Sequence, residues 1–307
     1  MLAALLQMML LMACGAVWKH AAPSHISTLS HRRAITDLVF YIFLPALVLE
    51  VIWKTPLNES SLQISFLAMS GVALGLLLMW LALRAFKASK KQTGTLLLAA
   101  AFPNATYLGL PVLDQVLGDY TRAVALQYDL FACTPILLSL GILLASYYGD
   151  AKVAANPLTE LMKIPPLWAV VLGVTLNLTG VQQAEFLQIS LSTLAAAVVP
   201  LMLIVLGMSI RWQSLQLRYL PLLSLVAIIT LVLVPITVFG LSHAIGLAEQ
   251  LITPVSLIAA MPTMVFGIVI CERYQLDSEL YAAAVTLTTV LCLVTLPIAF
   301  YLLSSSL

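Results

Sequence analysis

The chain has 307 residues, of which 62% are hydrophobic and 9% are charged, and its mean hydropathy is +1.06. Soluble domains carry about 25% charged residues, so this composition excludes an ordinary soluble protein. The formal net charge of +1 points to no charged partner, and no nucleic-acid partner is expected. We therefore expect an all-α polytopic membrane protein whose main partner is the lipid bilayer.

Apolar runs between polar breaks predict ten membrane spans of the required length, about 20 residues. The stretch 11–15 (LMACG) resembles a lipoprotein cleavage box, but no Lys or Arg precedes it before Lys19, so residues 2–18 are interpreted as the first span. The expected spans are residues 2–18, 34–53, 62–83, 93–116, 123–148, 164–180, 188–210, 218–242, 252–271 and 279–303.

The 14 Lys and Arg residues are spread unevenly over the loops between these spans. Only Lys54 and Arg122 lie outside the loops that follow odd-numbered spans. Basic residues collect in cytoplasmic loops, so the odd loops are expected in the cytoplasm and both termini outside. This predicts an integral protein of the cytoplasmic (inner) membrane.

The two halves of the chain, residues 1–148 and 164–307, are expected to form two five-helix repeats joined by a cytoplasmic connection at 149–163. Pro45 of the second span and Pro200 of the seventh occupy matching positions. Because each half has an odd number of spans, the repeats run in opposite orientations.

The fourth and ninth spans carry breaks at corresponding places in these halves. Pro103 and Pro111 interrupt one span, and Pro262 and Gly267 interrupt the other. A lone proline kinks many membrane helices, but paired interruptions in inverted repeats indicate the binding site of a secondary transporter.

Broken helices can bind an anion without a basic residue. The N-terminus of a half-helix carries partial positive charge and free N–H groups, which suit a carboxylate. Asn104 and Thr106 can donate hydrogen bonds to such a substrate, Tyr107 can line the cavity, and Thr263 is their polar counterpart in the second half. Each of these could instead only cap a broken helix.

Asp129, in the fifth span, has two open interpretations. Carboxylates at such depth face a cavity and often relay protons, so Asp129 is a candidate for ion coupling. A structural hydrogen bond to an exposed helix end explains it equally well.

Cofactors, metals and catalysis are not expected. The cysteines lack the spacing of disulfides or zinc ligands, and the histidines form no Ser–His pair or HExxH motif within a span. An intramembrane enzyme is therefore not expected.

Four stretches of the chain resemble segments of the auxin efflux carrier family. FPNATYLGLPVL (102–113) is similar to its signature, LVFYIFLPALVLEVIW (38–53) to its second span, VALQYDLF (124–131) to the start of its fifth span, and MPTMVFGIVICERYQLD (261–277) to its ninth. Gly267 stands where plant members have a second proline, and the short connection replaces their long hydrophilic loop. Auxin is thus a poorly supported substrate, and the compact form resembles the bacterial branch associated with malate and malonate.

The resemblance implies ten spans in two inverted repeats, as in bile-acid and sodium–proton transporters, with discontinuous helices 4 and 9 crossing. Spans 1, 2, 6 and 7 would form a scaffold, in a homodimer, and spans 3–5 and 8–10 a moving transport domain. The expected function is elevator-type transport of a small organic anion, with a proton or sodium as a possible coupling ion. A cation exchanger of the same fold and a carrier-derived sensor are the alternatives.

The resemblance also implies that the substrate binds where the two breaks cross. Gln127 matches the family, and we favour it over Asp129 for lining this site. The expected substrate-binding residues are Asn104, Thr106, Tyr107, Gly109, Pro111, Gln127, Pro262, Thr263 and Gly267.

Overall fold

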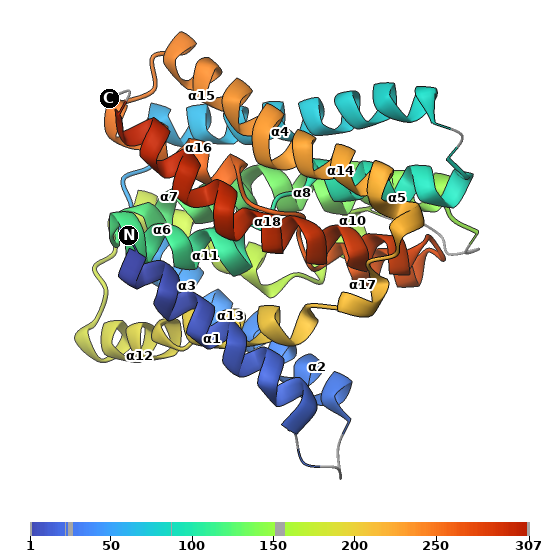
Figure 1. Cartoon of the computed structure of the whole chain (residues 1–307). Coiled ribbons are helices and arrows are strands. Elements are labelled where there is room, and N and C mark those ends of the chain that lie inside the picture. Colours follow the sequence, from blue (N-terminus) through green and yellow to red (C-terminus); the bar gives the residue numbers. More distant parts are fainter. Residues whose placement is uncertain (1, 22, 24–26, 87, 151–156, 306–307) are drawn as a thin grey trace.

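The computed structural model describes residues 2–21, 23, 27–86, 88–150 and 157–305. This part of the chain is all-helical, apart from its loops and one isolated β-bridge. The helices pack side by side in a bundle, and the start of α1 (Leu2–Ala21) and the end of α18 (Ser278–Ser305) lie toward the same side of it (Figure 1).

Six helical segments among the described residues are long and apolar enough to cross a membrane, with mean hydropathies from 2.0 to 2.8. The prediction of an all-α polytopic membrane protein is therefore confirmed. The six are α2 with α3 (Thr28–Leu38, Leu44–Lys54), α4 (Glu59–Ala85), α7 to α9 (Thr121–Tyr128, Thr134–Ile136, Ile142–Tyr148), α12 with α13 (Glu185–Ala196, Val198–Ser209), α14 with α15 (Leu220–Ile228, Val234–Ala244) and α18.

The remaining helices are shorter or interrupted. They are α1, α5 (Lys90–Ala101), α6 (Leu110–Leu117), α10 (Pro157–Met162), α11 (Pro165–Leu178), α16 (Glu249–Ala259) and α17 (Gly267–Arg273). The count of ten spans and their inverted-repeat relation stay predictions. Residues 151–156 of the expected connection and residues 306–307 lie outside the described part.

Several long helices widen into π-helical turns just before a proline. Such turns occupy Val39–Phe43, Ala105–Gly109, Asp129–Cys133 and Ile229–Leu233, and the prolines that follow are Pro45, Pro111, Pro135 and Pro235. A proline has no N–H, and its ring clashes with the carbonyl four residues earlier. The wider turn relieves this clash, so these prolines bend helices without ending them.

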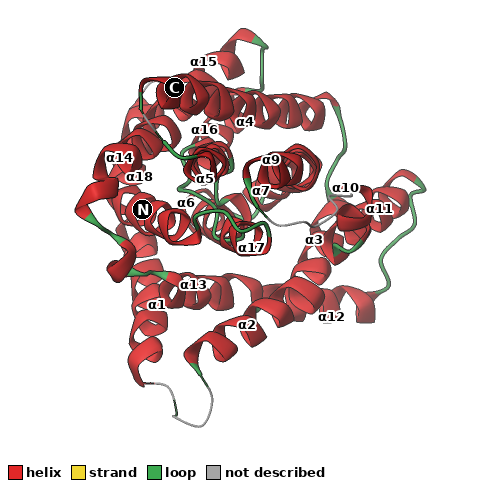
Figure 2. Ribbon diagram, turned by 90° about the vertical axis from the view of Figure 1, so that its right-hand side faces the viewer, coloured by secondary structure: helices red, strands yellow, loops and turns green. Residues whose placement is uncertain are grey.

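The helices form two groups when viewed along the bundle (Figure 2). In the lower group, α13 packs on α1, and α11 and α12 pack on α3. In the upper group, α5 contacts α4 and α18, and α15 contacts α16. The lower group contains the helices expected as scaffold, and the upper group those expected as the transport domain. That one group moves against the other stays a prediction.

Two glycines allow very close packing between α1 and α13. A Cβ on Gly15 would lie 2.0 Å from the carbonyl oxygen of Ile204, and a Cβ on Gly207 would lie 1.9 Å from that of Met12. Small residues let membrane helices approach backbone to backbone, where dispersion contacts supply the attraction. The first helix is therefore held firmly against the second half of the chain.

Candidate functional site

The interruptions of α5–α6 and α16–α17 lie side by side. Pro103 and Thr263 form an antiparallel β-bridge. The N–H of Asn104 donates to the carbonyl of Pro262 at 2.7 Å, and the N–H of Met264 donates to that of Phe102 at 3.0 Å. We call residues 102–104 and 262–264 the junction. Backbone groups that each break frees are thus satisfied by the other break, as a nonpolar surrounding requires.

Thr263 is the polar centre of the junction and is fully buried. Its hydroxyl donates to the carbonyl of Ala99 at 2.8 Å, and its N–H donates to the hydroxyl of Thr288 at 3.1 Å. Ala99 lies four residues before Pro103, so its carbonyl is the one that the proline leaves without a helical N–H. Thr263 therefore supplies a missing hydrogen bond, which is the capping role considered from the sequence.

Gly109 and Gly267 make room for neighbouring side chains. A Cβ on Gly109 would lie 2.7 Å from Cδ1 of Ile258, and a Cβ on Gly267 would lie 2.0 Å from the hydroxyl of Tyr281. That hydroxyl donates to the carbonyl of Met264 at 3.0 Å, inside the junction. The unwound backbone at Met264 is thus stabilised by a tyrosine for which Gly267, the first residue of α17, leaves room.

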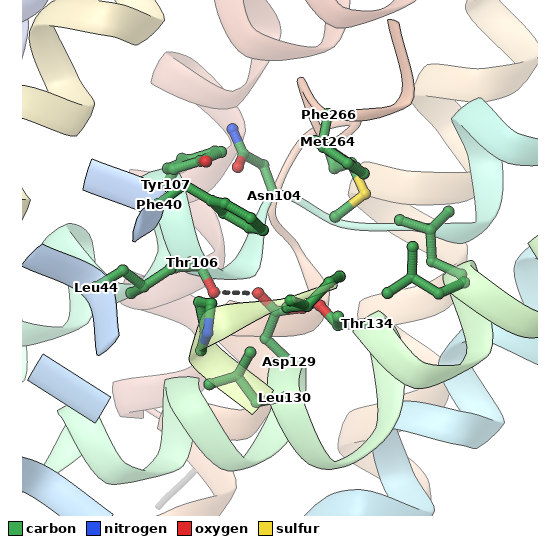
Figure 3. Close-up of a pocket in the computed structure, with 14 residues that line it drawn as sticks. Phe40, Leu44, Asn104, Thr106, Tyr107, Asp129, Leu130, Thr134, Met264 and Phe266 are labelled. Atoms are coloured by element: carbon green, nitrogen blue, oxygen red, sulfur yellow. Dashed lines mark hydrogen bonds between the residues drawn. The ribbon is translucent and has the colours of Figure 1, made fainter. Parts of the chain in front are cut away.

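A small cavity of about 60 Å³ lies beside the junction, where the two helix groups meet (Figure 3). The expected residues Asn104, Thr106, Tyr107 and Asp129 line it. The other lining residues are Phe40, Leu44, Leu130, Thr134, Leu137, Leu138, Ile164, Pro166, Met264 and Phe266. Its wall is mostly apolar, with a few convergent polar groups, which is typical of a small-molecule site.

Asn104 presents an unused donor at this cavity. The residue is 1% exposed, and its side-chain Nδ2 has no hydrogen-bond partner among the described residues. The backbone carbonyl of Asn104 accepts from the N–H groups of Leu108 and Gly109. These hydrogen bonds start the helix of the second half-span. A buried amide without a partner is costly, so the unpaired Nδ2 of Asn104 calls for an explanation.

Asp129 is hydrogen-bonded to the interrupted span. Its Oδ2 accepts from the hydroxyl of Thr106, and its Oδ1 accepts from the hydroxyl of Thr134 at 2.9 Å (Figure 3). Thr134 is five residues after Asp129, and the π-helical turn Asp129–Cys133 brings these positions together. The carboxylate is 4% exposed and belongs to the cavity wall.

A larger cavity of about 470 Å³ adjoins the small one. Phe40, Tyr107 and Phe266 are among the residues that line both, and the rings of Phe40 and Phe266 stack with centroids 6.4 Å apart. The charged residues on its wall are Arg32, Arg33, Asp37, Lys163 and Glu272. We call the two spaces the inner and outer cavities, and the aromatic pair lies between them.

The structure separates the expected site residues into two sets. Gly109, Pro111, Pro262, Thr263 and Gly267 lie in or around the junction but are not among the residues that line the inner cavity. Gln127 is buried in α7 and is not among the residues that line the inner cavity, so its place in the substrate site stays a prediction.

Sequence reasoning missed Phe40, Thr134, Met264 and Phe266. For Thr134 the only available signal was Pro135 directly after it, since a proline within a span disturbs the regular helix before it. For the other three, apolar side chains in apolar spans carry no mark of cavity lining. Within the described residues, no three His, Cys, Asp or Glu side chains are grouped to hold a metal ion.

Comparison with known proteins identifies the relatives of this chain. The family described as "Membrane transport protein" matches residues 1–300. An uncharacterized transporter of Methanothermobacter thermautotrophicus is 30% identical over 67% of both chains. One of Methanocaldococcus jannaschii is 28% identical over 84% of this chain and 85% of its own, and the uncharacterized transporter YfdV of Escherichia coli is 24% identical over 70% of both.

Proposed function

This chain belongs to the membrane transport protein family, which is the auxin efflux carrier family that its motifs resemble. We propose that it is a secondary transporter of a small organic anion. Malate or malonate is the substrate we favour, and the cytoplasmic membrane is the expected location. The observation that carries the proposal is the unpartnered amide of Asn104, buried at the inner cavity beside the junction.

The direction of nearby dipoles favours an anion. Thr106 and Tyr107 form the first turn of the helical segment that begins at Ala105, and both line the inner cavity. The first N–H groups of a helix have no intrahelical partner, and its N-terminus carries about half a positive charge. Together with the Asn104 amide, this turn presents donors to a carboxylate.

The sizes of the two cavities favour a small carboxylate with a second polar end. The inner cavity, about 60 Å³, accommodates one carboxylate group. The outer cavity, about 470 Å³, falls within the roughly 300–1,000 Å³ of typical ligand sites and can hold the rest of the molecule. Arg32 and Arg33 on its wall attract an approaching anion, and Asp37 and Glu272 partly offset them.

For the transport cycle we propose elevator-type movement of spans 3–5 and 8–10 against a scaffold of spans 1, 2, 6 and 7. The arrangement in two groups supports this, as does the position of both cavities at their boundary. In the proposed arrangement, ten spans form two inverted repeats, discontinuous helices 4 and 9 cross at the junction, and both termini lie outside. The outer cavity then opens to the cytoplasm.

We also propose that two copies associate through the scaffold. Leu178 at the end of α11 and Phe186 in α12 are exposed and apolar, which suits contact with lipid or a second copy. Light scattering of the purified protein, corrected for bound detergent, is expected to give twice the chain mass. A single chain mass would contradict the dimer without touching the transport proposal.

The decisive experiment is counterflow in proteoliposomes. Vesicles loaded with unlabelled malate or malonate should take up the labelled anion from outside, and protein-free vesicles should not. Counterflow needs no ion gradient, so it tests substrate movement independently of coupling. Absence of exchange for both anions would contradict the proposal, and binding without exchange would favour the carrier-derived sensor.

Asp129 in the inner cavity favours one alternative, a sodium–proton exchanger of the same fold. Such an exchanger needs a buried acid to bind the cation. It predicts that a sodium gradient alone changes the internal pH of proteoliposomes without any carboxylate. A carboxylate transporter leaves the internal pH unchanged under that condition.

A further inference from the structure

We propose that Asp129 is a proton-binding site that takes up a proton when the anion binds, which makes the chain a proton–anion symporter. This inference rests on the proposed function and names its coupling ion. Asp129 shares the inner cavity with the donor of Asn104, and it is hydrogen-bonded to Thr106 in the first turn of the half-helix there.

Among the described residues that line the inner cavity, Asp129 is acidic and none is basic. Both carboxylate oxygens of Asp129 are engaged, one by the hydroxyl of Thr106 and one by that of Thr134. Hydroxyl groups can donate to an ionised carboxylate and can accept from a protonated one. The same two partners therefore serve both protonation states, and neither state needs a counter-ion.

The elements packed around Asp129 carry few titratable groups. Tyr107 from the interrupted span, Tyr128 from α7 and Cys133 from its own π-helical turn are its titratable neighbours. The stretches of α8 and α11 contain no charged residue, and the charged residues of α4, Glu59 and Arg84, lie at its two ends.

Charged groups farther out are engaged elsewhere. Arg122 of α7 forms an ion pair with Asp114, with its Nε 2.7 Å from Oδ1. Arg32, Arg33 and Lys163 line the outer cavity and not the inner one. No lysine, arginine or histidine among the described residues lining the inner cavity is therefore available to neutralise a carboxylate pair there.

Anion binding then places a second carboxylate beside Asp129. Two carboxylates that share a poorly solvated site cannot both stay ionised, and one of them takes a proton. The helix N-terminus and the Asn104 amide stabilise the charge on the substrate, so the proton goes to Asp129. Binding of the anion and uptake of the proton are thus linked. The anion and the proton move together, so the charge carried across is one unit less negative than that of the anion alone.

Proton uptake on binding tests this directly. Titration calorimetry of malonate into the purified protein at pH 7.5, in two buffers of different ionisation enthalpy, counts the protons taken up. We expect proton uptake by the wild type, and a Kd for malonate that weakens as the pH is raised. Asp129→Asn, whose amide resembles the protonated acid, should bind malonate with no proton uptake, and Asp129→Glu should retain it.

Proteoliposomes give the second measurement. An inward proton gradient should drive malonate accumulation by the wild type, whereas in Asp129→Asn the gradient should add nothing to the uptake that this variant shows without a gradient. Binding by the wild type without proton uptake, or accumulation by Asp129→Asn equal to the wild type, would overturn this inference alone. Absence of both binding and counterflow in the wild type would overturn the proposed function and this inference with it.

Discussion

The hydroxyl of Thr263 donates to the carbonyl of Ala99 at 2.8 Å, across the two halves of the chain. Pro103 leaves that carbonyl without its helical partner, so a side chain of the second half completes a helix of the first. The break in one span is therefore stabilised by the break in the other.

Thr263→Val is expected to lower stability more than substrate affinity. The substitution keeps the shape and leaves the buried carbonyl of Ala99 unsatisfied, at a cost of about 1–3 kcal/mol. Thermal unfolding in detergent should show a clearly lower Tm. Thr193→Val is the control, because that exposed hydroxyl bonds only within its own helix and should leave the Tm unchanged. A weakened Kd at unchanged Tm would instead place Thr263 in the binding site.

Asn104→Ala is expected to weaken anion binding without unfolding the protein. A hydrogen bond to a charged group contributes about 1.5–3 kcal/mol, so Kd for malonate should rise roughly 10- to 100-fold. Because the amide Nδ2 has no partner among the described residues, its loss breaks no hydrogen bond, and the protein should still fold. Gln188→Ala, which removes an exposed amide on α12, should bind like the wild type. Unchanged affinity in Asn104→Ala would contradict the site.

Gly207→Ala should loosen the packing of α13 on α1. The new Cβ would lie 1.9 Å from the carbonyl oxygen of Met12, which belongs to backbone and cannot rotate away. Overpacking of this kind costs about 1–3 kcal/mol, so the Tm should fall. Gly240→Ala is the matched control, because nothing lies within 4 Å of its Cβ and alanine stabilises a helix by up to about 1 kcal/mol. Equal Tm values for both variants would contradict the close approach.

The stacked rings of Phe40 and Phe266 are expected to limit access to the inner cavity. Their centroids lie 6.4 Å apart, and both rings line both cavities. Cys14 is exposed and the other three cysteines are buried, so Cys14→Ser removes the competing thiol. In a variant with Cys14→Ser and Asn104→Cys, a polar thiol reagent should label position 104 slowly. Adding Phe266→Ala should accelerate labelling several-fold, whereas Phe186→Ala on the exposed face of α12 should not. Equal labelling rates would mean that the pair is no barrier.

The membrane class and the positions of the breaks could be predicted from the sequence, because both depend on local chemistry. A high apolar fraction with few charges, arranged in runs of about 20 residues, predicts membrane-spanning helices. Pro103 and Pro262 interrupt a helix wherever they stand, since proline lacks an N–H. The resemblance to the family followed from the same residues, and the match over residues 1–300 confirms it.

The pairing of Asp129 with Thr134 in the wall of the inner cavity could not be predicted, because it depends on helix phase. An α-helix places residues five apart on different faces, which separates Asp129 from Thr134. The π-helical turn at Asp129–Cys133 shifts the phase and brings them together. Sequence reasoning assumed a regular helix and so preferred Gln127, whereas the structure places Asp129 in the wall.

The sequence by itself determined that two spans are broken and that polar residues lie at the breaks. Only the tertiary structure decided which polar groups complete backbone hydrogen bonds and which remain unused. The hydroxyl of Thr263 donates to the carbonyl of Ala99, whereas Nδ2 of Asn104, a residue of the cavity wall, has no partner among the described residues. The physical reason is that a buried donor bonds to whichever acceptor the fold brings within reach. For the hydroxyl of Thr263, that acceptor comes from the other half of the chain.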